Sequence, residues 1–277
     1  MKTTVTKLVC FLVLIPALAC SSSDRITSQK HFVQLNCSLK PITLGAAHAA
    51  LRIRNADGTA LNWSGYTVAT NLQKPKKGSV SNVAGQWVVP GIYQASSDDA
   101  FCSTWVGMDG YSSPTVEQIG TEDDWTPVGE QDYAWFEMYP DAGYEIMGFP
   151  VAPGDQIGAG VRSSGNGKFV LAITNYSAGA YYIVPASYSR SSSAVRSSGE
   201  WIVEAPSMGN NVLPLSDFDT ISFADCKVVV NGVKGSIVNA KWQFEAMTME
   251  ASDGAVMSVP SNLSANGTGF SVAWYNE

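Results

Sequence analysis

Short runs in which apolar and polar residues alternate follow one another from Asn62 to the end of the chain. The runs are rich in β-branched and aromatic residues, and turn-forming sequences such as SSGNGK, NG and SDG separate them. Because alternate side chains of a strand point to opposite faces, this pattern predicts β-strands. The clearest expected strands are residues 85–90, 103–109, 132–140, 155–164, 168–175, 199–206 and 226–235.

No convincing amphipathic helix accompanies these strands, so the pattern predicts an all-β fold built as an antiparallel sandwich or barrel. Of the 277 residues, 45% are hydrophobic and only 15% are charged, which agrees with one large β-rich domain. The Ser/Arg-rich segment 187–198 predicts an exposed loop before the strand that begins near Gly199.

The first nineteen residues have the features of a secretory signal peptide. The basic stretch MKTTVTK precedes the apolar run LVCFLVLIPALA, which ends at Ala17-Leu18-Ala19. This apolar run is too short to be a membrane-spanning helix. We therefore expect residues 1–19 to be removed and the rest to work outside the cytoplasm, as an outer-membrane lipoprotein, a periplasmic protein or a secreted protein.

Cys20 directly follows the expected cleavage site, and two interpretations remain open. Ala-Leu-Ala-Cys resembles a bacterial lipobox, in which Cys20 carries a lipid anchor and Ser21-Ser22-Ser23 is a tether. The same residues also satisfy the ordinary A-x-A rule, with Cys20 as an unmodified first residue. The serine tether favours the lipoprotein, so residues 20–59 are interpreted as a lipoprotein tether or a propeptide-like leader.

Few cysteines are available for disulfides or metal binding. If Cys10 leaves with the signal peptide and Cys20 is set aside, Cys37, Cys102 and Cys226 remain, so at most one disulfide can form among them. A Cys102–Cys226 bond is one option. The wide separations exclude closely spaced cysteine ligands, and we expect no metal site.

Charge divides the exported chain at residue 60. Residues 20–59 contain five basic and two acidic side chains, whereas residues 60–277 contain ten basic and twenty-two acidic ones. A cationic leader before an acidic domain is typical of an intramolecular partner such as a propeptide, and equally of a solvated tether. The acidic domain is a poor candidate for nucleic-acid binding.

The positions of the two histidines exclude several catalytic classes. His31 and His48 both precede residue 60, so the domain from Ala60 onwards has no Ser-His or Cys-His pair and no HExxH zinc site. It also lacks a GxxxxGK[ST] phosphate loop. Catalysis there would need carboxylates, amides, hydroxyls or lysines, and we expect no cofactor.

Two aromatic strands carry isolated glutamates. In GEWIVEAP, alternation places Glu200 and Glu204 on one face and Trp201 on the other. In AWFEMYP, Trp135 and Glu137 share a face. Burial beside aromatic rings raises the pKa of a carboxyl group and makes it a usable acid or base, whereas an exposed sheet face would leave these acids solvated.

Eight segments in order, over about two hundred residues, resemble the eqolisins, or glutamic peptidases, and their arrangement resembles the bacterial branch of that family. They are NWSGY (62–66), QWVVP (86–90), STWVGMDG (103–110), VEQIGT (116–121), YAWFEMYP (133–140), PGDQI (153–157), EWIVE (200–204) and FADCKV (223–228). The resemblance implies a lectin-like (concanavalin A-like) antiparallel β-sandwich of two large sheets, with a peptidase domain at 60–277.

The resemblance also implies a catalytic pair, Gln118 and Glu204. Glu204 would act as base and then acid on an attacking water, and Gln118 would stabilise the oxyanion. It further suggests that five residues line or orient the cleft: Trp63, Trp105, Asp109, Trp135 and Glu137. We expect an acid-active endopeptidase on polypeptide substrates, with the leader as an intramolecular inhibitor and a monomer as the working form.

The sequence departs from fungal relatives at Met138, where a tryptophan is usual, and at Glu117 and Ile119 beside the glutamine. Two other functions stay open at this point. One is a glycoside hydrolase that uses Glu137 and Glu204 as an acid and base pair. The other is a non-catalytic carbohydrate-binding module in which Trp63 and Trp135 stack on sugars.

Overall fold

The structure is a computed structural model that describes residues 32–42, 52–53, 58–93, 99–188, 194–208 and 211–277. The expected signal peptide and Cys20 lie outside these ranges. The described part of the chain is built from strands and connecting turns. It contains no helix with the length and apolar character needed to cross a membrane.

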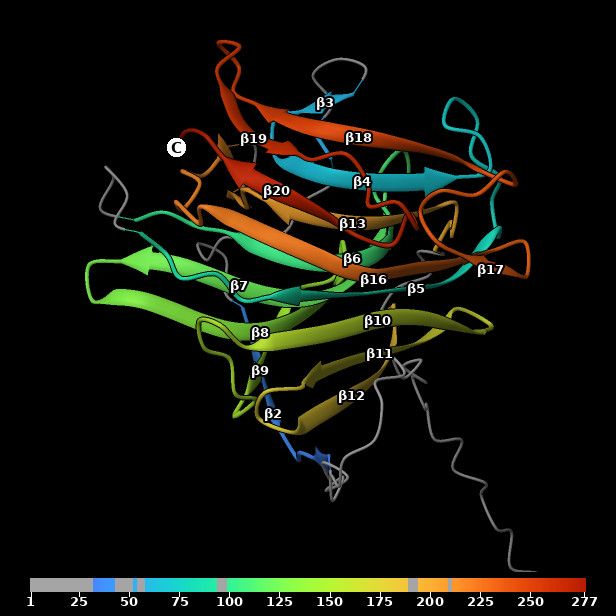
Figure 1. Cartoon of the computed structure of the whole chain (residues 1–277). Coiled ribbons are helices and arrows are strands. Elements are labelled where there is room, and N and C mark those ends of the chain that lie inside the picture. Colours follow the sequence, from blue (N-terminus) through green and yellow to red (C-terminus); the bar gives the residue numbers. More distant parts are fainter. Residues whose placement is uncertain (1–31, 43–51, 54–57, 94–98, 189–193, 209–210) are drawn as a thin grey trace, which may run out of the picture. The chain divides into compact units, whose positions relative to one another are not determined.

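Six of the seven segments singled out from the sequence are strands with ends shifted by a few residues, whereas the seventh, 226–235, contains the end of one strand, a turn and a second strand (Figure 1). The remaining strands, among them Val116–Thr126, were not singled out. The bounds of the strands are β1 (Val33–Gln34), β2 (Ser38–Pro41), β3 (Thr59–Ala60), β4 (Trp63–Ala69), β5 (Val80–Val88), β6 (Ser103–Asp109), β7 (Val116–Thr126), β8 (Gly129–Tyr139), β9 (Tyr144–Met147), β10 (Gln156–Gly165), β11 (Lys168–Asn175), β12 (Ala180–Ser187), β13 (Ser198–Glu204), β14 (Ser207–Met208), β15 (Asn211–Val212), β16 (Thr220–Val230), β17 (Val233–Gly235), β18 (Gln243–Glu250), β19 (Val256–Pro260) and β20 (Phe270–Trp274).

The strands form two layers that are visible in Figure 1. In the first sheet the hydrogen-bonded order is β18–β4–β13–β6–β7–β8–β9–β2, and all neighbours are antiparallel. In the second sheet the order is β19–β20–β16–β5–β10–β11–β12–β1, with β17 also paired to β16. The second half of β18 pairs with β19 and so joins the sheets. The predicted all-β sandwich of two large sheets is confirmed.

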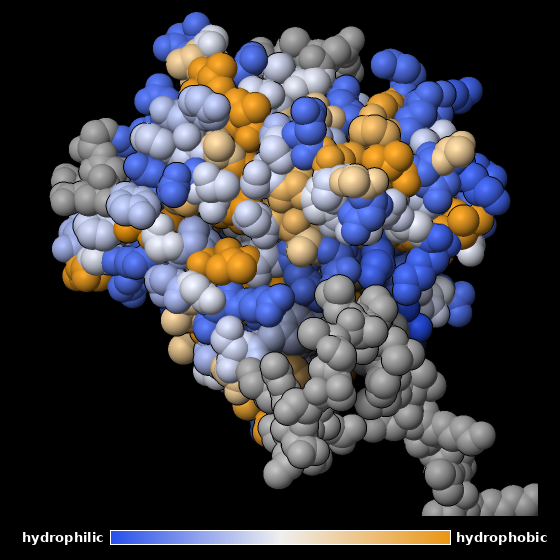
Figure 2. Space-filling model, viewed as in Figure 1, coloured by the Kyte–Doolittle hydropathy of each residue, from blue (hydrophilic) through white to orange (hydrophobic). Residues whose placement is uncertain are grey.

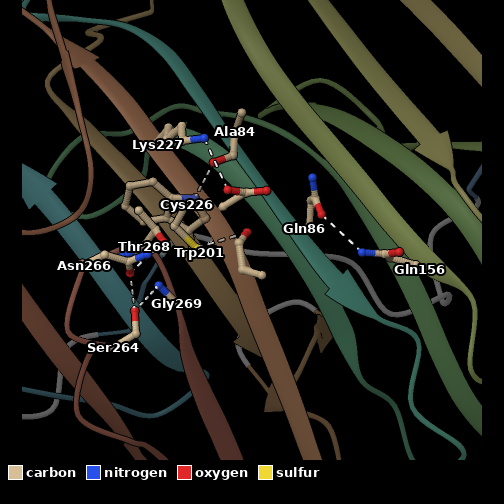
Figure 3. Close-up of polar contacts among 12 residues, drawn as sticks. Ala84, Gln86, Gln156, Trp201, Cys226, Lys227, Ser264, Asn266, Thr268 and Gly269 are labelled. Atoms are coloured by element: carbon tan, nitrogen blue, oxygen red, sulfur yellow. Dashed lines mark hydrogen bonds and ion pairs between the residues drawn. The ribbon is translucent and has the colours of Figure 1, made fainter. Parts of the chain in front are cut away.

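The main hydrophobic core lies between the two sheets. Strand alternation directs Trp201 and Val203 of β13 and Ile119 of β7 into it, where Trp87 of β5 also packs. The Trp201 Nε1 atom donates a hydrogen bond of 2.9 Å to the carbonyl oxygen of Ala84 in the second sheet, which ties the layers together (Figure 3).

The opposite face of the first sheet carries a second, smaller cluster, and we call this face the site face. The cluster contains Ala60, Trp63, Trp105, Val116, Trp135, Ile202 and Met247, all fully buried. Tyr111, Tyr133, Tyr139 and the leader residue Ile42 pack against it. The site face therefore has its own hydrophobic cluster, separate from the main core on the other face of the sheet. We call this cluster the aromatic floor.

Leader residues add strands to the edges of both sheets. β1 pairs in parallel with β12 of the second sheet, and β2 pairs with β9 of the first sheet. Lys40 of β2 forms an ion pair of 3.0 Å with Glu145 of β9. The leader is thus in contact with the domain on both of its layers.

One option that the sequence left open does not form, and one expectation holds only in part. Cys37, Cys102 and Cys226 are all free thiols, so a Cys102–Cys226 disulfide does not form. In the segment 187–198, expected to be an exposed loop, residues 188 and 194–197 lie between two strands, residues 189–193 lie outside the described residues, and Ser197 and Ser198 are buried. Ser197 is drawn in by hydrogen bonds to Asp109 at the end of β6.

The side of the surface seen in Figure 2 is largely hydrophilic, with hydrophobic residues in small separate groups. A hollow of about 700 Å³ lies where β8, β9, β12 and the leader strand β2 meet, and Leu39, Phe136 and Met138 contribute to its lining. This hollow includes neither Gln118 nor Glu204.

Candidate active site

Strand register brings one amide and two glutamates into a single row across the site face. Gln118 of β7 pairs with Gly107 of β6 on one side and with Glu137 of β8 on the other. Gly107 in turn pairs with Glu200 of β13. Each of these four residues lies two positions along its strand from a member of the aromatic cluster. The row therefore lies on the site face.

Glu204 lies on the same face but in a different row. It pairs with Ser103 of β6, and Ser103 pairs with Glu122 of β7. Gln118 and Glu204 therefore lie two strands apart and four residues apart along the strand direction, or about 10 Å across and about 13 Å along the sheet at their backbones. The aromatic row of Trp105 lies between them.

The carboxylate of Glu204 is fully buried and is held by two neutral donors. Asn62 Nδ2 donates to Glu204 Oε1 at 3.2 Å, and Trp105 Nε1 donates to Glu204 Oε2 at 2.9 Å. Hydrogen bonds donated to a carboxylate favour its ionised form. The site thus offers Glu204 a fixed orientation and compensation for the loss of water.

Gln118 is also fully buried, and its amide is oriented by a carboxyl group. Its Nε2 atom donates a hydrogen bond of 2.8 Å to Glu137 Oε2. Its Oε1 atom finds no donor within the described part of the chain. An amide nitrogen carries two hydrogens, so the second one remains available to a ligand.

The indole ring of Trp105 connects the two groups. Its Nε1 atom bonds to Glu204, while its Cζ3 atom lies 2.9 Å from where a Cβ atom on Gly107 would stand. Gln118 Cβ lies 3.1 Å from that same point. The Nε1 edge of the ring thus holds Glu204, while the Cζ3 atom of the ring and Gln118 Cβ both border Gly107, where only glycine leaves room for them.

Burial shifts the pKa values of the neighbouring acids upwards. Desolvation raises the pKa of Glu137 to about 8, although the Gln118 hydrogen bond opposes the shift. Desolvation also raises the pKa of Glu122 to about 8, with the charge of Asp123 and that of Glu204 adding to the rise and the Ser103 hydroxyl opposing it. In acid, Glu137 and Glu122 are both neutral.

Glu200 is a further buried acid on this face. It accepts a hydrogen bond of 3.2 Å from Thr67 Oγ1, and its Oε2 atom has no donor within the described residues. Burial raises its pKa well above the usual value for glutamate. The glutamates expected from the sequence to be either buried or solvated are buried: Glu137, Glu200 and Glu204.

The other expected site residues divide into two groups. Trp63 and Trp135 belong to the aromatic floor, and the ring of Trp63 packs edge-on against Trp105 at 4.9 Å between centroids. Asp109 instead lies at the end of β6, in contact with neither Gln118 nor Glu204. It accepts hydrogen bonds from the backbone amides of Arg196 and Ser197 and so fixes the start of β13.

Sequence reasoning missed three residues of the site. Asn62 is the first residue of the NWSGY segment and had no predicted role, yet its amide donates a hydrogen bond to Glu204. Gly107 and Glu122 were not singled out, because only the strand register shows which glycine and which acid share a row with the expected pair. A buried strand position occupied by glycine was the one available signal for Gly107.

The geometry bears on the two functions left open by the sequence. Glu137 hydrogen-bonds to Gln118 and lies three strands across and four residues along from Glu204. Trp63 and Trp135 are fully buried, so their rings are not presented to solvent as a sugar-binding platform would be. Neither observation favours a glycosidase or a carbohydrate-binding module.

Comparisons with known proteins agree on one family. The Peptidase A4 family profile matches residues 61–274. Aspergillopepsin-2 of Aspergillus niger is 24% identical over 62% of this chain and 65% of its own length, and scytalidopepsin B of Scytalidium lignicola is 28% identical over 50% of this chain and 55% of its own length. The chain thus spans less than two thirds of either relative.

Solved structures show the same fold. A crystal structure of scytalido-glutamic peptidase with a peptide-based transition state analogue superposes with a TM-score of 0.63 at 23% identity, over 77% of this chain and 98% of that one. Aspergilloglutamic peptidase from Aspergillus niger superposes with a TM-score of 0.57 at 23% identity, over 64% of this chain and 99% of that one. With the sandwich, the site face and the family match in agreement, the chain belongs to the Peptidase A4 family.

Proposed function

We propose that the chain is a glutamic endopeptidase that hydrolyses peptide bonds with Glu204 and Gln118. The proposal rests on a donor-supported carboxylate, Glu204, and an amide, Gln118, that share the site face on either side of the Trp105 row. The family match supports the same reaction class. The substrate would lie over the ring, between the two groups.

In the proposed reaction, ionised Glu204 removes a proton from a water molecule as its oxygen attacks the peptide carbonyl carbon. The second Nε2 hydrogen of Gln118 donates to the oxyanion that forms. Protonated Glu204 then gives its proton to the leaving nitrogen, and the C–N bond breaks. The products are a carboxylic acid and an amine, and Glu204 is again ionised.

Acid activity follows from the charges around the pair. Asn62 and Trp105 support an ionised Glu204, while Glu137 and Glu122 stay neutral below a pH of about 8. Neutral neighbours leave the single negative charge on Glu204 and do not repel an oxyanion beside Gln118. As the pH approaches 8, both neighbours ionise and this arrangement is lost.

Glu200 is the competing candidate for the base. It lies in the row of Gln118, directly across Gly107, whereas Glu204 lies four residues further along. Burial raises its pKa well above the usual value for glutamate, and Thr67 Oγ1 donates to it, whereas Glu204 accepts hydrogen bonds from both Asn62 and Trp105. We therefore assign the base to Glu204 and keep Glu200 as the comparison in the test of that assignment.

We propose that the leader blocks the site until it is displaced. The backbone amide of Ile53 donates to Asn62 Oδ1 at 2.8 Å, and the same Asn62 holds Glu204. Ile42 packs on the aromatic floor, and the side chain of Arg52 is 2% exposed beside Glu245. Loss of these contacts would free the leader from the site face.

The leader proposal predicts that Arg52→Glu, which places a negative charge beside Glu245, releases proteolytic activity at a higher pH than in the wild type. Lys40→Glu is the matched control, because Lys40 pairs with Glu145 at the sheet edge. Equal pH thresholds in both variants would count against inhibition through Arg52.

The test of the reaction class is product analysis. Denatured protein and a panel of polysaccharides are incubated separately with the purified chain between pH 2 and 8, and the products are identified by mass spectrometry. Peptides with new free termini, formed fastest in acid, are expected. Release of sugars without any peptide cleavage would contradict the proposal.

We also propose export, with lipid attached at Cys20. The support is the sequence of the first twenty residues alone. Radioactive palmitate incorporated into the wild-type chain but not into Cys20→Ala, in a bacterial host that processes lipoproteins, is the expected result. Equal labelling of both chains, or no labelling, would contradict lipidation at Cys20.

A further inference from the structure

The side chain of Arg52, a leader residue, lies in a small polar pocket on the site face. Its guanidinium stacks over the ring of Tyr111 at 4.6 Å from the centroid, and its Nη2 atom lies 3.7 Å from Glu245 Oε2. The Tyr111 hydroxyl donates to the same Glu245 oxygen at 2.8 Å, which fixes the carboxylate. Nη2 also donates to the Thr59 carbonyl at 3.0 Å.

The two side chains that contact the guanidinium belong to the domain, whereas Arg52 itself and the Thr59 carbonyl belong to the leader. Tyr111 and Glu245 lie within residues 61–274, which match the family, and Arg52 precedes them. A leader arginine therefore occupies a site whose aromatic ring and carboxylate come from the peptidase domain. Its side chain is almost entirely shielded from solvent.

The pocket is aligned with the proposed oxyanion donor. Glu245 of β18 pairs with Thr67 of β4, and Thr67 pairs with Glu200 of β13. Glu200 pairs with Gly107, and Gly107 with Gln118. A polypeptide laid along this row would pass Gln118 and reach the Tyr111 ring.

We propose that Tyr111 and Glu245 form a substrate subsite for a cationic side chain, arginine foremost, and that Arg52 occupies it as a stand-in for substrate. This inference rests on the proposed peptidase function. A planar guanidinium can stack on an aromatic face and pair with a carboxylate at the same time, which an ammonium group does less well. The acidic excess of the domain, with twenty-two acidic against ten basic residues after residue 59, favours the same substrates.

The binding test needs no catalysis. In the full chain, Arg52→Ala empties the pocket, and ethylguanidinium then serves as the probe, with uncharged N-ethylurea as its isostere. At about ten times its Kd, the cation should raise the unfolding temperature of Arg52→Ala by about 3 °C. It should leave the wild type unchanged, because Arg52 fills the site. If Arg52→Ala does not fold, Arg52→Met keeps the aliphatic stem and removes only the guanidinium.

Matched variants locate the effect. Adding Glu245→Gln to Arg52→Ala should abolish the shift. Adding Glu145→Gln, which removes a carboxylate that pairs with a different leader cation at β9, should preserve it. Equal shifts with ethylguanidinium and N-ethylurea, or a shift that survives Glu245→Gln, would overturn the subsite.

The cleavage test separates the subsite from the peptidase function. Peptides with arginine or norleucine at successive positions around one scissile bond are compared by kcat/KM. At one position arginine should be favoured by about tenfold, and Glu245→Gln should remove that preference. Cleavage with no arginine preference at any position overturns the subsite and leaves the peptidase standing. Ethylguanidinium binding without any peptide cleavage overturns the peptidase and, with it, the pocket's role in substrate binding.

Discussion

Trp105 lies between the row of Glu204 and the row of Gln118, and its Nε1 atom donates a hydrogen bond to Glu204. Each of the pair also has its own support: Asn62 donates to Glu204, and Glu137 accepts from Gln118. Glu204, which must be ionised to act as the base, accepts hydrogen bonds from neutral donors. The Gln118 amide, which must donate to the oxyanion, is oriented by the Glu137 acceptor. At the scale of single residues, the chemistry depends on these neutral partners.

Replacing Gln118 tests the oxyanion role. We expect Gln118→Ala to lower kcat by about 10²–10³-fold, because one preorganised donor is lost from a buried site. The change should leave most of the base function of Glu204 intact, so residual hydrolysis should persist in acid. Steady-state cleavage of a denatured protein measures the effect. A wild-type rate from Gln118→Ala would contradict the role.

Glu137 should set the alkaline limit of activity. Burial raises its pKa to about 8, so it is neutral in acid and becomes negative beside Gln118 as the pH rises. Glu137→Gln cannot ionise, and we expect it to extend activity to higher pH while the acid limb stays in place. The pH profile of kcat/KM gives the answer. An unchanged alkaline limb would show that another group controls it.

At the scale of strands, β6 sets the spacing of the site, because it lies between β13 and β7 and carries no side chain at Gly107. Alternation in the sequence correctly predicted which residues of β13 share a face, including Glu200 and Glu204. It could not predict register, since the pairing of strands far apart in the sequence depends on the whole sandwich. For that reason Glu122 and the row of Glu200 emerged only from the structure.

The contacts of the leader with the domain could not be predicted from the local sequence pattern either. The basic charge of the leader suggested an intramolecular partner, but the contacts of Arg52 with Tyr111 and Glu245 join segments far apart in the chain. Asn62 illustrates the same limit. Nothing in its neighbours along the sequence indicates that it holds a glutamate 142 residues away.

Adding one methyl group to β6 should disturb the site more than the fold. In Gly107→Ala the new Cβ would stand 2.9 Å from the Trp105 ring and 3.1 Å from Gln118 Cβ, so both must move. We expect activity to fall at least tenfold, with destabilisation of about 1–3 kcal/mol. Gly91→Ala, shortly after β5, is the control, since its Cβ would meet nothing nearer than 3.9 Å. Equal activity losses in both would contradict a specific role for Gly107.

At the scale of the whole molecule, the sandwich buries an unusual number of acids. Desolvation raises the pKa of Asp132 to about 7 and those of Glu122 and Glu137 to about 8, and it raises the pKa of Asp123 well above its usual value. Such groups bind protons more tightly in the folded chain than in the unfolded chain. The folded state is therefore favoured in acid, and its advantage decreases as the pH rises from the ordinary carboxyl range towards 8.

The expected result is a free energy of unfolding that is highest in acid and falls by about 1.4 kcal/mol per pH unit for each such group between its unfolded and folded pKa values. Urea unfolding between pH 3 and 9 measures it. Glu122→Gln keeps an oxygen acceptor for Ser103 but cannot ionise, so its curve should be flatter. A stability that rises with pH across this range would contradict the account.

The identity of the general base is tested by two rates of cleavage of a denatured protein at the wild-type pH optimum. One is the rate of Glu204→Gln and the other is the rate of Glu200→Gln. Both substitutions are nearly isosteric and both positions are fully buried on the site face. If Glu204 is the base, Glu204→Gln should lose about 10³-fold in kcat while its unfolding temperature is preserved. Glu200→Gln should keep most of the activity. An active Glu204→Gln beside an inactive Glu200→Gln would move the base to Glu200 and contradict the mechanism.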